Sequence, residues 1–228
     1  MRMHVLDNIP LHIDRQFLCQ SLRIKEGSER AAELNRMIEE AESIGRPRGM
    51  YREAYIDDRS DSGVIIEGIA FESRVLRINL ETAERVFPLV ATCGRELEEW
   101  GKGFDDMLLR FFADTIQATA IGEAFRVMID HLENQYHPGK VSPMSPGSLD
   151  DWPISEQVKL FRLLGDTEKI IGVTLTEGFC MIPLKSISAL IFPTEVDFHS
   201  CQLCRRENCP ERRAPYDAHL HETKYGKL

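Results

Sequence analysis

The sequence predicts an α+β fold in which a twisted antiparallel sheet is flanked by helices, one of them long. Three observations support this prediction. Short segments rich in β-branched and aromatic residues follow one another between residues 50 and 91. An apolar stripe then recurs every seven residues from 104 to 132, which indicates one long helix. Two strand-like apolar runs lie between 173 and 192, after an amphipathic helix. Strands and helices in this mixed order are typical of the α+β class.

Length and composition limit the function classes. A chain of 228 residues with 43% hydrophobic and 29% charged residues suits one large domain or two small ones. The net charge of −9 argues against a nucleic-acid or anionic-membrane binder, which needs a basic face. No apolar run approaches the roughly 20 residues that span a bilayer, and the start has no signal-peptide core. We therefore expect a cytoplasmic protein whose six cysteines are thiols or metal ligands.

The N-terminal elements follow from capping residues and apolar spacing. A short β-like run covers residues 4–6, and a first helix is expected to begin after Asp14 as its N-cap. Gly27 and Ser28 separate it from a second helix and cap that helix, which carries apolar residues at spacings of three and four and ends near Gly45. The segments 50–55, 63–67, 69–71 and 86–91 are then expected to be strands.

A long helix is expected from about residue 104 to 132 or beyond, after a strand-to-helix turn at Cys93 and Gly94. The stripe that predicts it consists of Phe104, Phe111, Ala118, Phe125 and Leu132. Because Thr115, Ala118 and Gly122 are small, we expect another backbone to approach the helix along this side. The stripe is interpreted as core packing.

The stretch 140–192 begins with a loop rich in Pro, Gly and Ser that shows no periodicity. A loop of this length inside a compact domain is usually functional or disordered. An amphipathic helix follows, with Ser155 as the expected N-cap. Asp166 is expected to cap a short turn, and the runs 173–176 and 182–192 are expected to be strands.

The motifs of this stretch occur in a characteristic order. A Pro-Gly loop, a helix, a Leu-Thr-Glu segment and a Ser-containing strand succeed one another; the matching residues are Ser145, Pro146, Gly147, Leu175, Thr176, Glu177, Phe179, Met181, Pro183, Ser186, Ser188 and Phe192. This order resembles the S-adenosylmethionine-binding activation domain of cobalamin-dependent methionine synthase. The resemblance covers roughly residues 88–193 and implies a single curved α+β unit. We divide the chain into an N-terminal part of the same domain (1–80), an activation-domain-like core (81–195) and a Cys-rich tail (196–228).

The resemblance implies a pocket for S-adenosylmethionine. Where the family has an Arg and two Tyr residues that hold the ligand, this chain has Ser142, Ser148 and Ile191, so the frame is kept while the binding residues differ. The nearest cation is Lys140, and Asp150 and Asp151 could reach an ammonium group. The candidate ligand-binding residues are Lys140, Ser142, Pro146, Gly147, Ser148, Asp151, Trp152 and Glu177. Two alternatives stay open for the loop: it braces the helix that follows Trp152, or it contacts a partner protein or a corrinoid.

Three cysteines lie close together near the C-terminus. Cys201, Cys204 and Cys209 form a C-x2-C-x4-C pattern followed directly by Pro210. Such spacing suits a metal site, with Cys180 as the first choice for a fourth ligand and His199 as the second. The spacing does not choose between zinc and a 4Fe-4S cluster, and reduced surface thiols are the alternative.

The tail and the loop together narrow the resemblance. Residues 193–217 and 142–157 resemble two paired motifs of stand-alone relatives in anaerobic corrinoid methyltransferase systems. This implies an accessory protein for cobalamin-dependent methyl transfer, which docks on a corrinoid protein or cobalamin-dependent methyltransferase and helps to return its cobalamin to the methylated state. The chain is then at most a component of such a methyltransferase. Two other hypotheses stay open: a non-catalytic, metal-stabilised partner-binding module, and a methyltransferase subunit with a thiolate-bound zinc.

Overall fold

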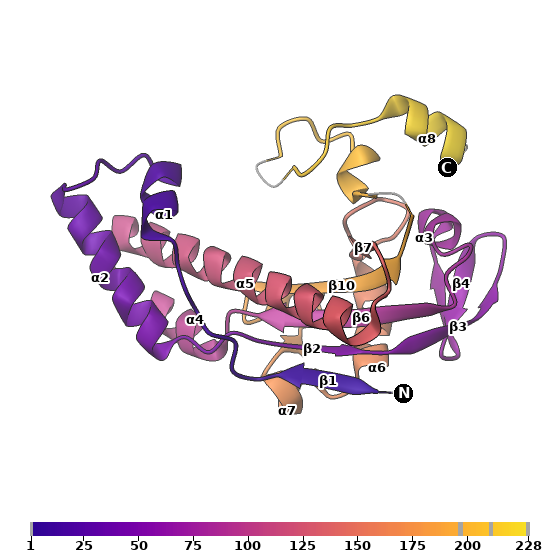
Figure 1. Ribbon diagram of the computed structural model, residues 1–228, viewed down its shortest axis with the longest axis horizontal. Coiled ribbons are helices and arrows are strands. Elements are labelled where there is room, and N and C mark those ends of the chain that lie inside the picture. The colour runs from indigo at the N-terminus through magenta and orange to yellow at the C-terminus, as the bar shows by residue number, and fades with distance from the viewer. Residues whose placement is uncertain (1, 196–197, 210–211, 227–228) are drawn as a thin grey trace.

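The computed structural model describes residues 2–195, 198–209 and 212–226 (Figure 1). Its strands are β1 (Met3–Leu6), β2 (Arg48–Arg52), β3 (Ala54–Arg59), β4 (Gly63–Ile66), β5 (Ile69–Glu72), β6 (Arg85–Thr92), β7 (Val141–Met144), β8 (Thr174–Leu175), β9 (Met181–Ile182) and β10 (Ser186–Pro193). Its helices are α1 (Arg15–Ser21), α2 (Glu29–Ile44), α3 (Arg74–Asn79), α4 (Arg95–Lys102), α5 (Met107–Tyr136), α6 (Gln157–Leu164), α7 (Thr167–Ile171) and α8 (Ala218–Lys224), with short 3-10 turns η1 (Ile154–Glu156) and η2 (Ser200–Gln202).

Eight of the strands form one sheet around β6. The path runs β1-β2-β6-β3-β4-β5, and β10 pairs with both β6 and β7. All of these pairs are antiparallel. β8 and β9 form a separate two-stranded hairpin. The predicted α+β class with an antiparallel sheet and one long helix is therefore confirmed.

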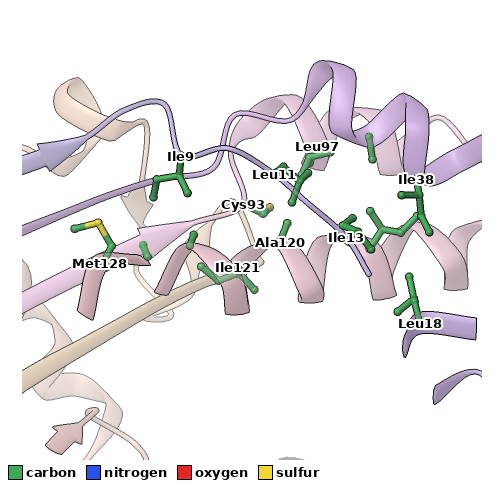
Figure 2. Close-up of a cluster of buried hydrophobic side chains, with 14 of the residues drawn as sticks. Ile9, Leu11, Ile13, Leu18, Ile38, Cys93, Leu97, Ala120, Ile121 and Met128 are labelled. Carbon is green, nitrogen blue, oxygen red and sulfur yellow. The ribbon is translucent and has the colours of Figure 1, made fainter. Parts of the chain in front are cut away.

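Strand β6 is buried along nearly its whole length because helices cover both faces of the sheet. Phe87, Leu89 and Ala91 contribute to one core, whereas Val86 and Val90 contribute to the other. The first core packs under α2 and α5, and Figure 2 shows Ile9, Leu11 and Ile13 of the N-terminal segment inserted in it beside α5. The second core contains residues of α3, α6 and the tail. The sheet is thus the middle layer between two apolar cores.

The predicted caps at three helix starts are confirmed. The Asp14 side chain accepts a hydrogen bond from the Phe17 N–H at 2.9 Å, and the Ser28 hydroxyl accepts one from the Ala31 N–H at 3.3 Å. Asp166 accepts one from the Lys169 N–H at 3.1 Å. The Ser155 cap is wrong: Ser155 lies inside η1, a 3-10 turn that begins after Pro153, and α6 follows at Gln157.

The buried face of α5 differs from the predicted stripe. Phe111 is 54% exposed and Ala118 and Gly122 are exposed, so no backbone packs against that side within the described chain. The residues that face the core are Phe112, Ala113, Ile116, Gln117, Ala120, Ile121, Ala124, Met128 and Leu132. A seven-residue repeat drifts by about 20° per heptad around a straight helix, so it does not follow one face over 30 residues. The close approach to the sheet occurs instead at Gly49 of β2, where a Cβ atom would lie 2.6 Å from Met128 Cγ.

Several elements were not expected from the sequence, among them α3, β7 and the tail helix α8. The short helix α3 follows Ser73, whose hydroxyl accepts a hydrogen bond from the Leu76 N–H at 3.0 Å. The start of the Pro-rich loop forms strand β7, which pairs with β10 from Leu190↔Met144 to Pro193↔Val141. None of the described helices has both the length and the apolar character needed to cross a membrane.

Candidate functional site

A cavity of about 820 Å³ lies where the Pro-rich loop, the start of α3 and the C-terminal tail meet. Its lining comes from four segments: residues 74–75 of α3, residues 148–151 of the loop, residues 203–206 of the tail, and His221 of α8. In Figure 1 the tail, orange to yellow, lies over the end of the molecule that carries β7 and α3. Pockets for small organic ligands have about this volume.

The loop between residues 145 and 152 is held in one shape by its own hydrogen bonds. The Gly147 N–H donates to the Trp152 carbonyl at 2.7 Å, and the Trp152 N–H donates to the Leu149 carbonyl at 3.1 Å. The Ser145 hydroxyl donates to the Ser188 carbonyl of β10 at 2.7 Å, which fixes the loop to the sheet. Gly147 has a φ of +82°, and a Cβ atom there would lie 2.9 Å from Ile154 Cδ1. Both facts favour glycine at this position.

The Asp151 carboxylate accepts hydrogen bonds at the start of α3. It accepts hydrogen bonds from the Val75 N–H at 2.9 Å, from the Arg74 N–H at 3.2 Å and from the Ser73 hydroxyl. A carboxylate at the first turn of a helix satisfies N–H groups that have no partner inside the helix. The geometry therefore gives Asp151 a structural task, the fastening of the loop to α3, while its contact with a ligand ammonium stays a prediction.

Trp152 is fully buried in the second core and lines no part of the cavity. Its ring meets the Phe71 ring edge-on, with a centroid distance of 6.3 Å. No atom of the described residues accepts a hydrogen bond from its indole N–H. Trp152 anchors the loop in the core, so it is not available as a stacking surface for an adenine ring.

Two further candidates hold backbone rather than face the cavity. The Ser142 hydroxyl is buried and accepts a hydrogen bond from the Phe198 N–H of the tail at 3.2 Å. The Lys140 carbonyl accepts one from the Thr194 N–H at 2.9 Å, and Lys140 is outside the cavity lining. Ser148, like Asp151, does line the cavity, and the Ser148 hydroxyl donates to the Ser145 carbonyl at 2.6 Å. Pro146 is buried beside it.

Glu177 does not line the loop–tail cavity. It lines a second cavity of about 480 Å³ beside α6, which shares no residue with the loop–tail cavity. The turn that carries it is closed by the Thr176 hydroxyl, which accepts a hydrogen bond from the Cys180 N–H at 3.0 Å. The structure thus separates Glu177 from Ser148 and the rest of the loop.

The tail is fastened to the body by three buried side chains, Phe198, Leu203 and Tyr225, which join the second core. The Tyr225 hydroxyl donates to the Asn79 Oδ1 of α3 at 2.5 Å. Burial raises the pKa of Tyr225 to about 12, so the phenol stays protonated and remains a donor at neutral pH. The tail residues that line the cavity therefore lie on a segment with its own core contacts.

The Cys-containing loop of the tail folds around the guanidinium group of Arg212. This group donates to the carbonyl of Cys201 at 2.9 Å, to that of Cys204 at 3.0 Å, to that of Ala214 at 3.1 Å, and to that of Arg206. Four carbonyl oxygens of the tail are thereby paired with a single side chain.

The metal site stays a prediction. Cys201, Cys204 and Cys209 are half-buried in the tail, whereas Cys180 is exposed in the turn between β8 and β9. Among the residues that the structure describes, no three His, Cys, Asp or Glu side chains are arranged to hold a metal ion. Pro210 lies outside the described residues. The donor set in this arrangement does not fit a four-ligand site, and metal analysis of the purified protein would test the prediction.

The structure adds cations that the sequence reading had not assigned to a ligand. Arg205 and Arg206 line the cavity from the tail, and Arg74 and His221 line it from α3 and α8. The sequence signal for Arg205 and Arg206 is a short run of basic residues around the cysteines. Their position over the loop depends on contacts between segments that are far apart in the sequence. One such contact joins Phe198 of the tail to Ser142, 56 residues earlier.

Comparison with known proteins finds similarity among solved structures. No protein-family model matches the chain, and no curated protein sequence matches it. Among solved structures, the crystal structure of the MetH reactivation domain bound to AdoHcy is similar with a TM-score of 0.61, over 89% of this chain and 82% of that chain, at 16% sequence identity. At this identity the likeness concerns the fold: the chain has the fold of the MetH reactivation domain.

Proposed function

We propose that this chain is an accessory protein of cobalamin-dependent methyl transfer that binds an S-adenosyl ligand in the loop–tail cavity. The observation that carries the proposal is the shared fold with a reactivation domain whose structure holds AdoHcy (S-adenosylhomocysteine), together with a ligand-sized cavity beside the Pro-Gly loop. The order of the motifs between residues 145 and 192 supports the same ligand class independently of the cavity.

The chemistry of the cavity suits such a ligand. An S-adenosyl compound carries a carboxylate, an ammonium group and an apolar base. The cavity offers arginines for the first, the Asp150 carboxylate for the second, and the side chains of Val75, Leu149 and Leu203 for apolar contact. A mixed lining of this kind is what a zwitterion joined to an aromatic base requires.

In this proposal the chain binds and positions while other groups perform the chemistry. A reductant of the methyl-transfer system supplies one electron to the inactive cob(II)alamin of a corrinoid partner, the resulting cob(I)alamin takes the methyl group of S-adenosylmethionine, and AdoHcy is the leaving group. The task of this chain is to hold the methyl donor in a fixed place next to the partner, which lowers the entropic cost of the transfer. The partner is a corrinoid protein or a cobalamin-dependent methyltransferase.

Calorimetric titration of the protein with S-adenosylmethionine and with AdoHcy tests the proposal. We expect binding of both ligands in the micromolar range and loss of binding in Ser148→Trp, because an indole at this position fills the cavity. The matched control is Ser155→Trp, at an exposed serine outside the cavity lining. Absence of heat with the unaltered protein at millimolar ligand contradicts the proposal.

A further inference from the structure

The tail side of the cavity is cationic. Arg205 and Arg206 directly follow Cys204 in the sequence. Both are exposed and line the cavity. Within residues 2–195, 198–209 and 212–226, no carboxylate or carbonyl accepts a hydrogen bond or ion pair from either guanidinium group. Both groups are therefore available to an anionic part of a ligand.

The other charged groups of the lining are already engaged or carry the opposite sign. The Arg74 side chain donates to the Gly226 carbonyl at 3.5 Å, and the Asp151 carboxylate caps α3. Asp150 is exposed on the loop side of the cavity. The lining thus presents an acid on the loop side and two arginines on the tail side.

The backbone of the turn that carries Arg205 and Arg206 is held by hydrogen bonds and by core packing. The Arg212 guanidinium donates to the carbonyl of Cys204 at 3.0 Å and to the carbonyl of Arg206. Leu203, the residue before this turn, is 7% exposed and belongs to the second core. A turn fixed at both ends loses less conformational freedom when its side chains bind a ligand.

We propose that Arg205 and Arg206 of the tail form the carboxylate subsite of the cavity and hold the amino-acid end of the S-adenosyl ligand. This inference rests on the proposed function and deepens it. It assigns recognition of the ligand carboxylate to the tail, since Lys140 is outside the lining and the Ser142 hydroxyl accepts a hydrogen bond from the Phe198 N–H. Arg212 is then a positioning residue for the subsite.

The test compares two ligands that differ at the amino-acid end. AdoHcy carries the carboxylate, whereas 5′-methylthioadenosine has the same nucleoside without it. In the double variant Arg205→Ala with Arg206→Ala, the Kd for AdoHcy is expected to rise about tenfold or more, because hydrogen bonds to a charged group are lost. The Kd for 5′-methylthioadenosine is expected to stay unchanged.

The matched control is Arg213→Ala, which removes an exposed arginine of the same tail that does not line the cavity. It is expected to leave both Kd values unchanged. If the double variant binds AdoHcy as tightly as the unaltered protein, or loses both ligands equally, the subsite assignment is overturned while the proposed function stands. If the unaltered protein binds neither ligand, the proposed function itself fails.

Discussion

At the scale of single residues, the loop shows how a candidate ligand contact can be a structural one. Asp150 and Asp151 are adjacent acids, and the sequence offers no reason to treat them differently. In the structure Asp151 accepts hydrogen bonds from two N–H groups at the start of α3, whereas Asp150 is exposed at the cavity. The two acids therefore have separate tasks.

We expect Asp151→Ala to lower the free energy of unfolding by about 1–2 kcal/mol, because the N–H groups of Arg74 and Val75 lose their acceptor. Asp150→Ala is the matched control and is expected to change stability by less than about 0.5 kcal/mol. Denaturant unfolding of the three proteins measures both effects. Equal stability of the two variants would contradict the structural task of Asp151.

At the scale of elements, the Cys-containing loop of the tail pairs its carbonyl groups with one side chain. Arg212 pairs with carbonyl oxygens between residues 201 and 214, and the three tail cysteines lie within or beside this loop. A variant without the guanidinium leaves these carbonyls without their donor. The loop then opens more often, and its half-buried thiols meet solvent.

We expect Arg212→Gln to increase the alkylation rate of Cys201 and Cys204 severalfold, while Arg213→Gln leaves it near that of the unaltered protein. Mass spectrometry of the alkylated peptides measures the rates. Cys93 serves as an internal reference in each sample, because burial raises the pKa of its thiol to about 12 and keeps it unreactive at neutral pH. Unchanged rates in Arg212→Gln would show that the loop is held by other contacts.

Local signals in the sequence predicted elements well where the determinants are local. The caps at Asp14, Ser28 and Asp166 were predicted because each acts on residues three positions away. The helix α3 was missed, since part of its N-terminal support comes from Asp151, 76 residues further along. The face of α5 was misplaced because the phenylalanine repeat at 104, 111 and 125 is stronger than the small-residue pattern that packs on the sheet.

At the scale of the whole molecule, the sheet separates two cores, and the cavity lies at the edge of the second one. The tail reaches this place because Phe198, Leu203 and Tyr225 are buried in the same core as Trp152. The resemblance over roughly residues 88–193 predicted the fold and pointed to the loop. It could not predict the tail's share of the cavity, because that share depends on packing between segments far apart in sequence.

The proposed function has one central claim, that an S-adenosyl ligand binds between the Pro-Gly loop and the tail. The most direct test is a crystal structure of the protein with AdoHcy. We expect the ligand between residues 148–151 and 203–206, with its carboxylate at Arg205 or Arg206 and its ammonium group at Asp150. A ligand in the cavity beside α6 that Glu177 lines, or elsewhere on the surface, would contradict the claim.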